Sequence, residues 1–229
     1  MANGKTALII GASRGLGAGL TRELAGRGWQ VVATQRKHAP ELAAIAADNS
    51  AVSIATVDID DTASVAALAA ALAGQSFDLV FVNAGVSGPP HGLAENVSSE
   101  DLAALMMTNA IAPVRTARAL LPLVKDGGTV AFMSSLLGSV ALRTHAMAEL
   151  YSASKAALNS LTRGFAAQDI GSKPIGVINV HPGWVKTDMG GDGADIDVAT
   201  SVAGMVDMLE ANTGPGHRYL DYQGKTLAW

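Results

Sequence analysis

Two kinds of hydrophobic pattern alternate along this chain of 229 residues. Short runs of consecutive apolar residues, such as residues 77–82 (FDLVFV), are typical of strands buried on both faces. Between these runs lie longer segments with apolar residues at helical spacing, as in Leu16, Leu20 and Leu24. The apolar runs predict strands over residues 5–10, 31–34, 52–57, 77–82, 128–133, 174–180 and 219–220. The intervening segments predict helices over residues 16–28, 39–47, 61–73, 100–110, 113–124, 149–168 and 196–209.

This alternation defines a fold class. Parallel strands need crossover connections, and helices normally supply them. The pattern therefore predicts an α/β fold with one doubly wound, mainly parallel seven-stranded sheet and helices on both faces. No repeat or linker interrupts the pattern, so we expect residues 1–229 to form a single domain. Potential N-caps precede three of the helices: Asp61 or Thr62, Ser98 or Ser99, and Asp195 or Asp197.

Composition excludes several functional classes. The chain is 49% hydrophobic, which is enough for one sizeable core. Its formal net charge is −4 and its longest basic cluster is residues 36–38, so no nucleic-acid partner is expected. The absence of cysteine excludes disulfides and thiolate catalysis. Because His91, His145, His181 and His217 do not pair at ligand spacing, no metal site is expected either.

Membrane association is also not expected. The apolar run near the first residue is too short for a secretory signal peptide. No stretch of eighteen uncharged apolar residues occurs that could span a bilayer. We therefore expect a soluble cytoplasmic protein without a membrane partner.

A glycine-rich turn follows the first predicted strand and reads Gly11-Ala12-Ser13-Arg14-Gly15-Leu16-Gly17. A strand, a glycine turn and a helix are the context of a dinucleotide site in a Rossmann fold. Gly11 would allow the tight turn, Gly15 would let the backbone approach a pyrophosphate, and Gly17 would let the helix pack on the strand. The free N–H groups at the start of that helix attract phosphate.

The end of the second strand bears on which dinucleotide binds. Proteins that prefer NAD commonly have an acidic residue there, which hydrogen-bonds the ribose 2′-hydroxyl. Here the strand ends in Gln35-Arg36-Lys37-His38, without an acid. Arg36 and Arg14 would suit a 2′-phosphate, because guanidinium groups bind phosphate with paired hydrogen bonds. We predict a preference for NADP(H), with NAD(H) as the alternative.

Tyr151 and Lys155 are the candidate catalytic pair. Their spacing of four residues places both on one face of the helix over residues 149–168. Because a neighbouring ammonium favours the phenolate, we expect Lys155 to lower the pKa of Tyr151. Such a tyrosine can exchange a proton with a carbonyl or alcohol oxygen. The same spacing is common on ordinary surface helices, and the glycine-rich turn makes the catalytic interpretation the stronger one.

Further polar and glycine residues follow later strands, at the sheet edge where ligands bind in this fold class. They are Asn83-Ala84-Gly85, Ser134-Ser135 and His181-Pro182-Gly183. With the glycine turn and Tyr151/Lys155, these motifs make essentially the whole chain resemble the short-chain dehydrogenase/reductase family. Finer details resemble its branch of C-factor and Sniffer-like carbonyl reductases, in residues 136–139, 154–159, 183–191 and 219–225.

The resemblance implies roles for individual residues. Tyr151 would be the acid/base, Lys155 would lower its pKa and bind the nicotinamide ribose, and Ser135 would hold the carbonyl oxygen. Asn109 would support a water molecule in a proton relay. Asp58 and Ile59 would meet the adenine, and Thr187 would contact the nicotinamide amide or the phosphates. The expected cofactor-binding residues are Gly11, Ser13, Arg14, Gly15, Leu16, Gly17, Gln35, Arg36, Asp58, Ile59, Asn83, Ala84, Gly85, Tyr151, Lys155, Pro182, Gly183, Val185 and Thr187.

Two departures from the family pattern bear on the site. Ile10 replaces a threonine that often precedes the first glycine, which removes one hydrogen bond from the turn. Ser135 precedes Tyr151 by sixteen residues, more than in many members, so the loop over residues 136–150 must bulge. The choice between Ser134 and Ser135 as the working serine therefore stays open.

The expected reaction is reversible hydride transfer between the nicotinamide and a carbonyl or alcohol carbon. The substrate would be a small or medium ketone or aldehyde, or the matching alcohol. The expected apolar pocket walls are Val86, Leu136, Leu137, Trp184 and Met189.

Two other functions and two oligomeric states remain open. One alternative is a 3-oxoacyl thioester reductase of the same family, in which Arg115, Arg118 and Lys186 would meet a carrier protein. The other is a non-enzymatic dinucleotide-binding signalling protein, although such proteins commonly lose the tyrosine or the lysine. Pairing through the helices over residues 113–124 and 149–168 would give a homodimer or a homotetramer.

Overall fold

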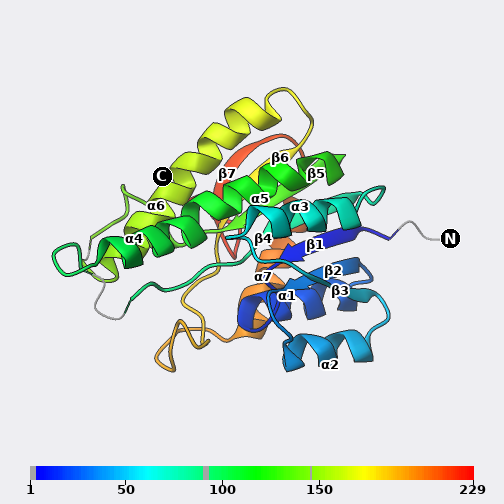
Figure 1. The fold of residues 1–229 in the computed structure, drawn as a ribbon, viewed down its shortest axis with the longest axis horizontal. Helices are drawn as coiled ribbons and strands as arrows, with labels where there is room; N and C mark the ends of the chain where they lie inside the picture. The colour runs from blue at the N-terminus through cyan, green and yellow to red at the C-terminus, as the bar shows by residue number, and fades with distance from the viewer. Residues whose placement is uncertain (1–3, 90–92, 145) are drawn as a thin grey trace.

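The computed structural model describes residues 4–89, 93–144 and 146–229. Within these residues, seven strands form one sheet in the order β3-β2-β1-β4-β5-β6-β7 (Figure 1). All six pairings between neighbouring strands are parallel. The strands are β1 (Thr6–Ile10), β2 (Gln30–Gln35), β3 (Val52–Thr56), β4 (Phe77–Val82), β5 (Val124–Met133), β6 (Gly176–His181) and β7 (Gly216–Asp221). The predicted doubly wound parallel sheet is confirmed.

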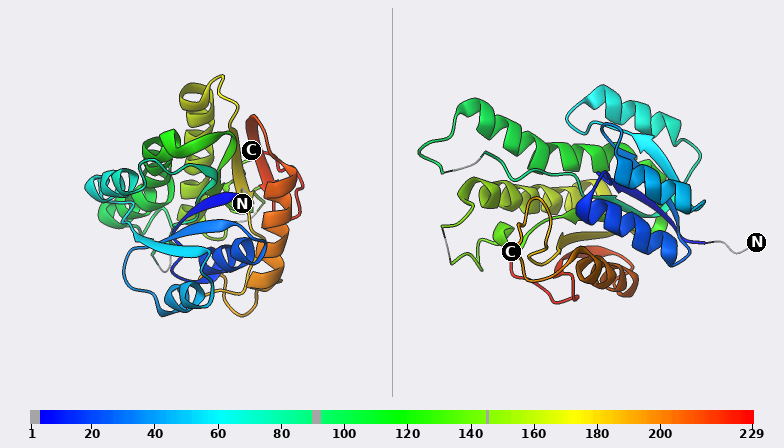
Figure 2. Two further views of the ribbon diagram at one scale, coloured as in Figure 1. Left: turned by 90° about the vertical axis from the view of Figure 1, so that its right-hand side faces the viewer. Right: turned by 90° about the horizontal axis from the view of Figure 1, so that it is seen from below.

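Helices cover both faces of the sheet, as the views in Figure 2 show. On one face lie α1 (Gly15–Gly26), α2 (Pro40–Asp48) and α7 (Val198–Ala211). On the other lie α3 (Thr62–Ala71), α4 (Ser99–Met106), α5 (Ala112–Leu120) and α6 (Glu149–Phe165). The predicted N-caps are found at Asp61, Ser98 and Asp197, whose side chains accept hydrogen bonds from Ala63, Asp101 and Thr200 backbone N–H groups.

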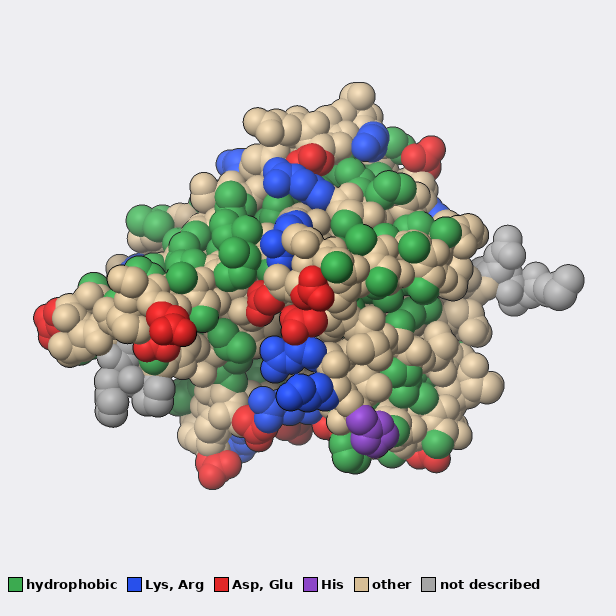
Figure 3. All heavy atoms as spheres, viewed as in Figure 1, with side chains coloured by type: hydrophobic (Ala, Val, Ile, Leu, Met, Phe, Trp, Pro, Cys, Tyr) green, Lys and Arg blue, Asp and Glu red, His purple; other side chains and the backbone are tan. Residues whose placement is uncertain are grey.

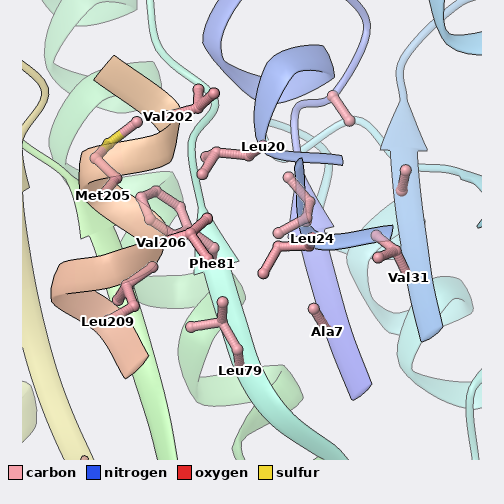
Figure 4. Close-up of a cluster of buried hydrophobic side chains, with 14 of the residues drawn as sticks. Ala7, Leu20, Leu24, Val31, Leu79, Phe81, Val202, Met205, Val206 and Leu209 are labelled. Atoms are coloured by element: carbon pink, nitrogen blue, oxygen red, sulfur yellow. The ribbon is translucent and has the colours of Figure 1, made fainter. Parts of the chain in front are cut away.

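The core consists of two apolar layers, one on each face of the sheet. Successive residues of a strand point to opposite faces, so in β1 Ala7 and Ile9 enter one layer while Leu8 and Ile10 enter the other. In the first layer, Leu20 and Leu24 of α1 and Val202, Met205, Val206 and Leu209 of α7 pack over Leu79 and Phe81 of β4 (Figure 4). This packing fixes α1, and with it the glycine-rich turn, on the sheet.

The helix around Asn109 differs from its prediction. We expected two helices, over residues 100–110 and 113–124, separated before Pro113. Instead α4 continues through a π-helical turn, η1 (Met107–Ile111), directly into α5, and a 3₁₀ turn, η2 (Leu121–Leu123), follows. Pro113 has no N–H to donate to the carbonyl of Asn109, so the wider turn accommodates the proline without ending the helix. A second π-helical turn, η4 (Ala166–Ile170), extends α6.

The last strand is also longer than predicted. The apolar pattern indicated only residues 219–220, but β7 pairs with β6 from Gly216 to Asp221. His217 and Arg218 are polar, and pairing with β6 rather than side-chain hydrophobicity holds them in the strand. Tyr219, already part of the predicted strand, pairs with Asn179 of β6. Among the described residues, no helix is both long and apolar enough to cross a membrane.

Candidate active site

The glycine-rich turn joins β1 to α1 at the carboxyl edge of the sheet. A Cβ atom added to Gly11, whose φ is +89°, would lie 2.8 Å from the Ala84 backbone. One added to Gly17 would lie 2.1 Å from the Gly11 carbonyl oxygen, closer than any side chain can approach. Both positions therefore require glycine, and the turn leaves its backbone accessible to a ligand in the manner of dinucleotide sites.

Side chains from neighbouring strands hold this turn. Thr34 Oγ1 accepts a hydrogen bond from the Gly11 N–H at 3.0 Å, and Asn83 Nδ2 donates to the Gly11 carbonyl at 2.6 Å. Thr34 on the next strand thus supplies a side-chain hydrogen bond to the turn, where Ile10 can supply none. Of the remaining turn residues, Ser13 and Arg14 precede α1, while Leu16 packs against the core.

A hollow of about 500 Å³ lies at the ends of β2 and β3. Its lining is rich in charged groups and consists of Arg36, Lys37, Thr56, Asp58, Asp61 and Ser64. Figure 3 shows Lys and Arg side chains gathered beside acidic ones on this molecule's surface. Two basic side chains at the end of the second strand fit the 2′-phosphate position predicted from the sequence.

Three of the predicted cofactor-binding residues have side chains that contact other parts of the protein. Arg14 does not line the hollow with Arg36, because its guanidinium pairs with Asp188. Gln35 turns its side chain to the start of α2, where Oε1 accepts the Ala39 N–H at 2.9 Å. The Ile59 side chain is buried in the core.

The loop that follows β6 lies opposite the glycine-rich turn at the carboxyl edge of the sheet. Thr187 Cγ2 lies 3.7 Å from the position that a Cβ on Gly15 would occupy. The Arg14–Asp188 ion pair spans the same gap. The preceding Pro182-Gly183 turn is fixed to α7, since Ser201 Oγ donates to the Pro182 carbonyl at 2.6 Å. Val185, in the same loop, is buried.

Lys155 is buried beneath Tyr151 on α6. Its ammonium Nζ donates to the Met133 carbonyl at the end of β5, at 2.8 Å, and lies 5.7 Å from the centre of the Tyr151 ring. A Cβ on Gly85 would lie 3.3 Å from this ammonium. The helical spacing therefore brings the two side chains together as predicted, against the segment that follows β4.

Asn109, in η1, links the segment after β4 to α6 through hydrogen bonds. Its Oδ1 accepts the Val86 N–H and its Nδ2 donates to the Val86 carbonyl, both at 2.8 Å. The same Nδ2 donates to Ser154 Oγ at 3.0 Å. Because the side chain is fully buried and already bonded, it fixes the backbone beside Lys155. Any further polar contact of Asn109 would have to come from its main chain.

The two serines after β5 have different environments. Ser134 is 1% exposed, and its hydroxyl donates to Asn159 Oδ1 at 2.7 Å in a buried polar network. Ser135 is partly exposed, and its hydroxyl oxygen accepts the Leu137 N–H at 3.2 Å. A hydrogen bond with Ser135 also acts on Tyr151. This geometry favours Ser135 as the serine available to a substrate.

The pKa values of the pair differ from the expectation. Burial raises the pKa of Tyr151 to about 12, because water no longer stabilises the phenolate, and the hydrogen bond with Ser135 only partly opposes this. Burial also lowers the pKa of Lys155 to about 8. The expected fall of the Tyr151 pKa is therefore not found. Desolvation is the largest cause, and the Lys155 ammonium is bonded to Met133 rather than to the phenol.

The predicted substrate residues differ in their exposure. Val86, Trp184 and Met189 are exposed, and Trp184 Nε1 donates to the Gly190 carbonyl at 2.9 Å. Leu136 is 38% exposed, and Leu137 is partly buried. Trp184 does not pack under the sheet.

Leu136 also borders a hollow of about 470 Å³ that the sequence did not predict. The other lining residues are Leu142, His181, Asp221, Tyr222, Lys225, Thr226, Leu227 and Ala228. These residues come from segments far apart in the chain. Only the position of His181 at a strand end could have indicated this hollow. In the described part of the chain, no group of three or more His, Asp or Glu side chains could hold a metal ion. His91 and His145 lie outside the described residues.

Comparison with known proteins shows which family the chain resembles. The short chain dehydrogenase family model matches residues 5–195. The chain is 39% identical over 158 residues to C-signal of Myxococcus xanthus, covering 66% of this chain and 92% of that protein. Carbonyl reductase from Pseudomonas aeruginosa PAO1, in complex with NADP, is 40% identical with a TM-score of 0.92, over 99% of this chain and 100% of that chain. Carbonyl reductase Sniffer of D. melanogaster is 31% identical with a TM-score of 0.89, over 99% and 100%.

The fold and the glycine-rich turn define a dinucleotide-binding protein of the doubly wound class. The family match and these relatives make the identification specific: the chain belongs to the short-chain dehydrogenase/reductase family. It is therefore an NAD(P)-dependent oxidoreductase that acts on a small molecule.

Proposed function

We propose that this protein uses NADP(H) to interconvert a ketone or aldehyde and the corresponding alcohol. One observation carries the proposal: Tyr151, Ser135 and Lys155 converge at the same sheet edge as the glycine-rich turn. A carbonyl reductase 40% identical over nearly the whole chain is known in complex with NADP.

The residues present fit the cofactor. Added Cβ atoms at Gly11 and Gly17 would collide with the backbone, so these positions keep the pyrophosphate-binding turn open. Arg36 and Lys37 line the hollow expected to take the 2′-phosphate. Thr187 faces Gly15 across the turn and would contact the phosphates or the nicotinamide amide. When bound, NADPH supplies the hydride.

Tyr151 would deliver the proton during reduction. With a pKa of about 12 it is neutral at physiological pH and therefore carries the proton that the developing alkoxide needs. Ser135 would donate a hydrogen bond to the same oxygen as negative charge grows on it. Lys155 lies behind the phenol, where its charge would stabilise the phenolate that remains after the transfer.

Asn109 and the apolar residues would shape the site. Asn109 holds the backbone of Val86 at the side of Lys155. Val86, Leu136, Leu137, Trp184 and Met189 would contact apolar parts of the substrate. Several of them are exposed, so the site is open and would accept substrates of varied size.

The structure gives little support to the carrier-protein alternative. Arg115 Nη2 donates to the carbonyls of Ile59 and Asp60, and Arg118 pairs with Asp169. Both arginines are thus engaged within the chain rather than presented to a partner. A signalling protein without catalysis would not need to keep Lys155 buried, at a desolvation cost.

Self-association is part of the proposal, and the sequence predicted it through residues 113–124 and 149–168. The exposed apolar residues Leu102, Met107 and Ile111 lie instead in α4 and η1, and Figure 3 shows apolar side chains gathered over α4 and α5. A homodimer or homotetramer would cover them. Sedimentation of the purified protein at several concentrations distinguishes these states from a monomer.

A panel of ketones, aldehydes and alcohols, assayed with each of the four nicotinamide dinucleotide forms, tests the function. We expect turnover of carbonyls by NADPH and of alcohols by NADP⁺. Absence of hydride transfer across a broad panel, with a protein that binds NADPH, would instead favour the signalling alternative. Turnover restricted to 3-oxoacyl thioesters would favour the carrier-protein alternative.

A further inference from the structure

Tyr219 connects the last strand to the proposed catalytic serine. It lies in β7, is 1% exposed, and its hydroxyl donates a hydrogen bond to the main-chain carbonyl of Ser135. In the sheet, β6 separates β7 from β5, at whose end Ser135 lies. The tyrosine therefore reaches across one strand to make this bond. A buried tyrosine hydroxyl needs a partner, and here one partner is a residue of the active site, while hydrogen bonds with Asn159 and Ser134 also act on Tyr219.

This bond restrains the direction of the serine side chain. Ser135 has extended backbone angles and stands at the start of a 3₁₀ turn, η3 (Leu136–Gly138). Its own hydroxyl oxygen accepts the Leu137 N–H. Three hydrogen bonds thus hold the residue: the Tyr219 hydroxyl and the Gly138 N–H, at 2.8 Å, both donate to its carbonyl, and its hydroxyl accepts the Leu137 N–H. Removal of the Tyr219 bond would leave the carbonyl held by the Gly138 N–H alone, so the peptide after Ser135 could shift and move the hydroxyl relative to Tyr151.

Trp229 supports Tyr219 from the other side. The two ring centres are 5.1 Å apart, and the Trp229 ring also contacts His217 at 4.6 Å and the Arg163 guanidinium at 5.1 Å. The Trp229 carbonyl accepts the Ala141 N–H at 3.0 Å. One residue therefore packs on the tyrosine and fastens the loop that follows η3.

The segment that carries Trp229 folds back over β7. The Leu227 N–H donates to the Tyr219 carbonyl at 2.8 Å, and Thr226 forms a bridge with Leu220. Tyr219 is thus fixed through both its main chain and its ring. This packing restrains the position of the Tyr219 hydroxyl.

We propose that Tyr219 is a positioning residue for Ser135 and that Trp229 holds Tyr219 in place. This inference rests on the proposed function, because it assigns the serine a role in the reaction. Tyr219 itself does not touch substrate or cofactor. It acts on the rate through the placement of the Ser135 hydroxyl, and the electrostatic effect by which Tyr219 raises the pKa of Tyr151 is a separate, smaller contribution.

A double-mutant cycle tests the proposal. We expect Tyr219→Phe to lower kcat roughly 10-fold, less than the 10²–10³-fold typical for removal of a hydrogen-bond donor to the reacting oxygen. The Kd for NADPH, measured by quenching of protein fluorescence, should stay unchanged. In a Ser135→Ala background the same change should have no further effect, because the group that it positions is already absent. Equal losses in both backgrounds, or full activity of Tyr219→Phe, would overturn the proposal.

Two further variants complete the design. Trp29→Phe is a matched control: it removes a hydrogen bond to Glu210 from a buried aromatic residue at the amino end of β2, and kcat should not change. If Tyr219→Phe does not fold, Trp229→Leu replaces it in the cycle, with the same expected dependence on Ser135. Full activity of Ser135→Ala would instead contradict the proposed catalytic role of the serine. This variant therefore distinguishes a failure of the proposed mechanism from a failure of the positioning role of Tyr219.

Discussion

At the scale of single residues, the chemistry depends on two neighbouring ionisable groups whose pKa values move apart. Burial raises the pKa of Tyr151 to about 12 and lowers that of Lys155 to about 8. The sequence predicted the pair but gave the wrong direction for the tyrosine. Helical spacing reports proximity, whereas desolvation depends on the surrounding fold and cannot be read from the spacing.

The lysine pKa leads to a pH dependence. Lys155 is charged below about pH 8 and loses its proton as the pH rises through that value, while Tyr151 stays protonated to about pH 12. Since kcat/KM reports groups of the free enzyme, we expect kcat/KM for carbonyl reduction to fall above about pH 8. The pH profile of kcat/KM would be measured at saturating and at limiting NADPH, for the wild-type protein and for Lys155→Met. The fall above about pH 8 should be absent in Lys155→Met. A wild-type profile that is level up to pH 10 would exclude a role for the lysine charge.

Arg36 gives a second prediction at this scale. Arg36→Ser should lower kcat/KM for NADPH by about 10–100-fold, because a charged hydrogen-bonding partner of the 2′-phosphate is lost. The value for NADH should hardly change. Arg22→Ser is the control, since Arg22 is an exposed arginine that faces Glu41 instead of the hollow. Equal losses with both dinucleotides would show that Arg36 does not recognise the phosphate.

At the scale of elements, residues that contact several segments hold the site together. The sequence predicted α1, α3, α6 and β4 well because each has a continuous apolar pattern or a clear N-cap. It missed the full length of β7 because pairing with β6, a long-range contact, decides its ends. For the same reason it missed Tyr219, Trp229 and the hollow beside Leu136. These features involve contacts between strands and loops that no local pattern describes.

Asn109 shows how an element depends on one side chain. Asn109→Ala would remove both hydrogen bonds to the Val86 backbone and leave its polar groups without their partner. Both bonds are partly buried, so the two losses together should lower the free energy of unfolding by about 1–3 kcal/mol. Urea unfolding followed by circular dichroism measures the loss. Thr108→Ala is the neighbouring control, because its exposed bond to Asp60 should contribute little. An unchanged stability of Asn109→Ala would mean that its hydrogen bonds do not hold the segment after β4.

At the scale of the whole molecule, one edge of a parallel sheet gathers every part of the proposed site. The glycine turn follows β1, the basic residues follow β2, Asn83 follows β4, Ser135 follows β5 and Gly183 follows β6. The alternation of strands and helices was sufficient to predict this convergence, because parallel strands present their carboxyl ends at one edge. It could not predict how closely the side chains meet there.

The central claim is that Tyr151 exchanges the proton during NADP(H)-dependent carbonyl reduction. The most direct measurement is the single-turnover rate of Tyr151→Phe with bound NADPH and a carbonyl that the wild-type protein reduces. We predict that hydride transfer is lost while the Kd for NADPH remains within a few-fold of the wild-type value, because the phenol contributes chemistry rather than cofactor affinity. A variant that reduces the carbonyl at the wild-type rate would contradict the claim.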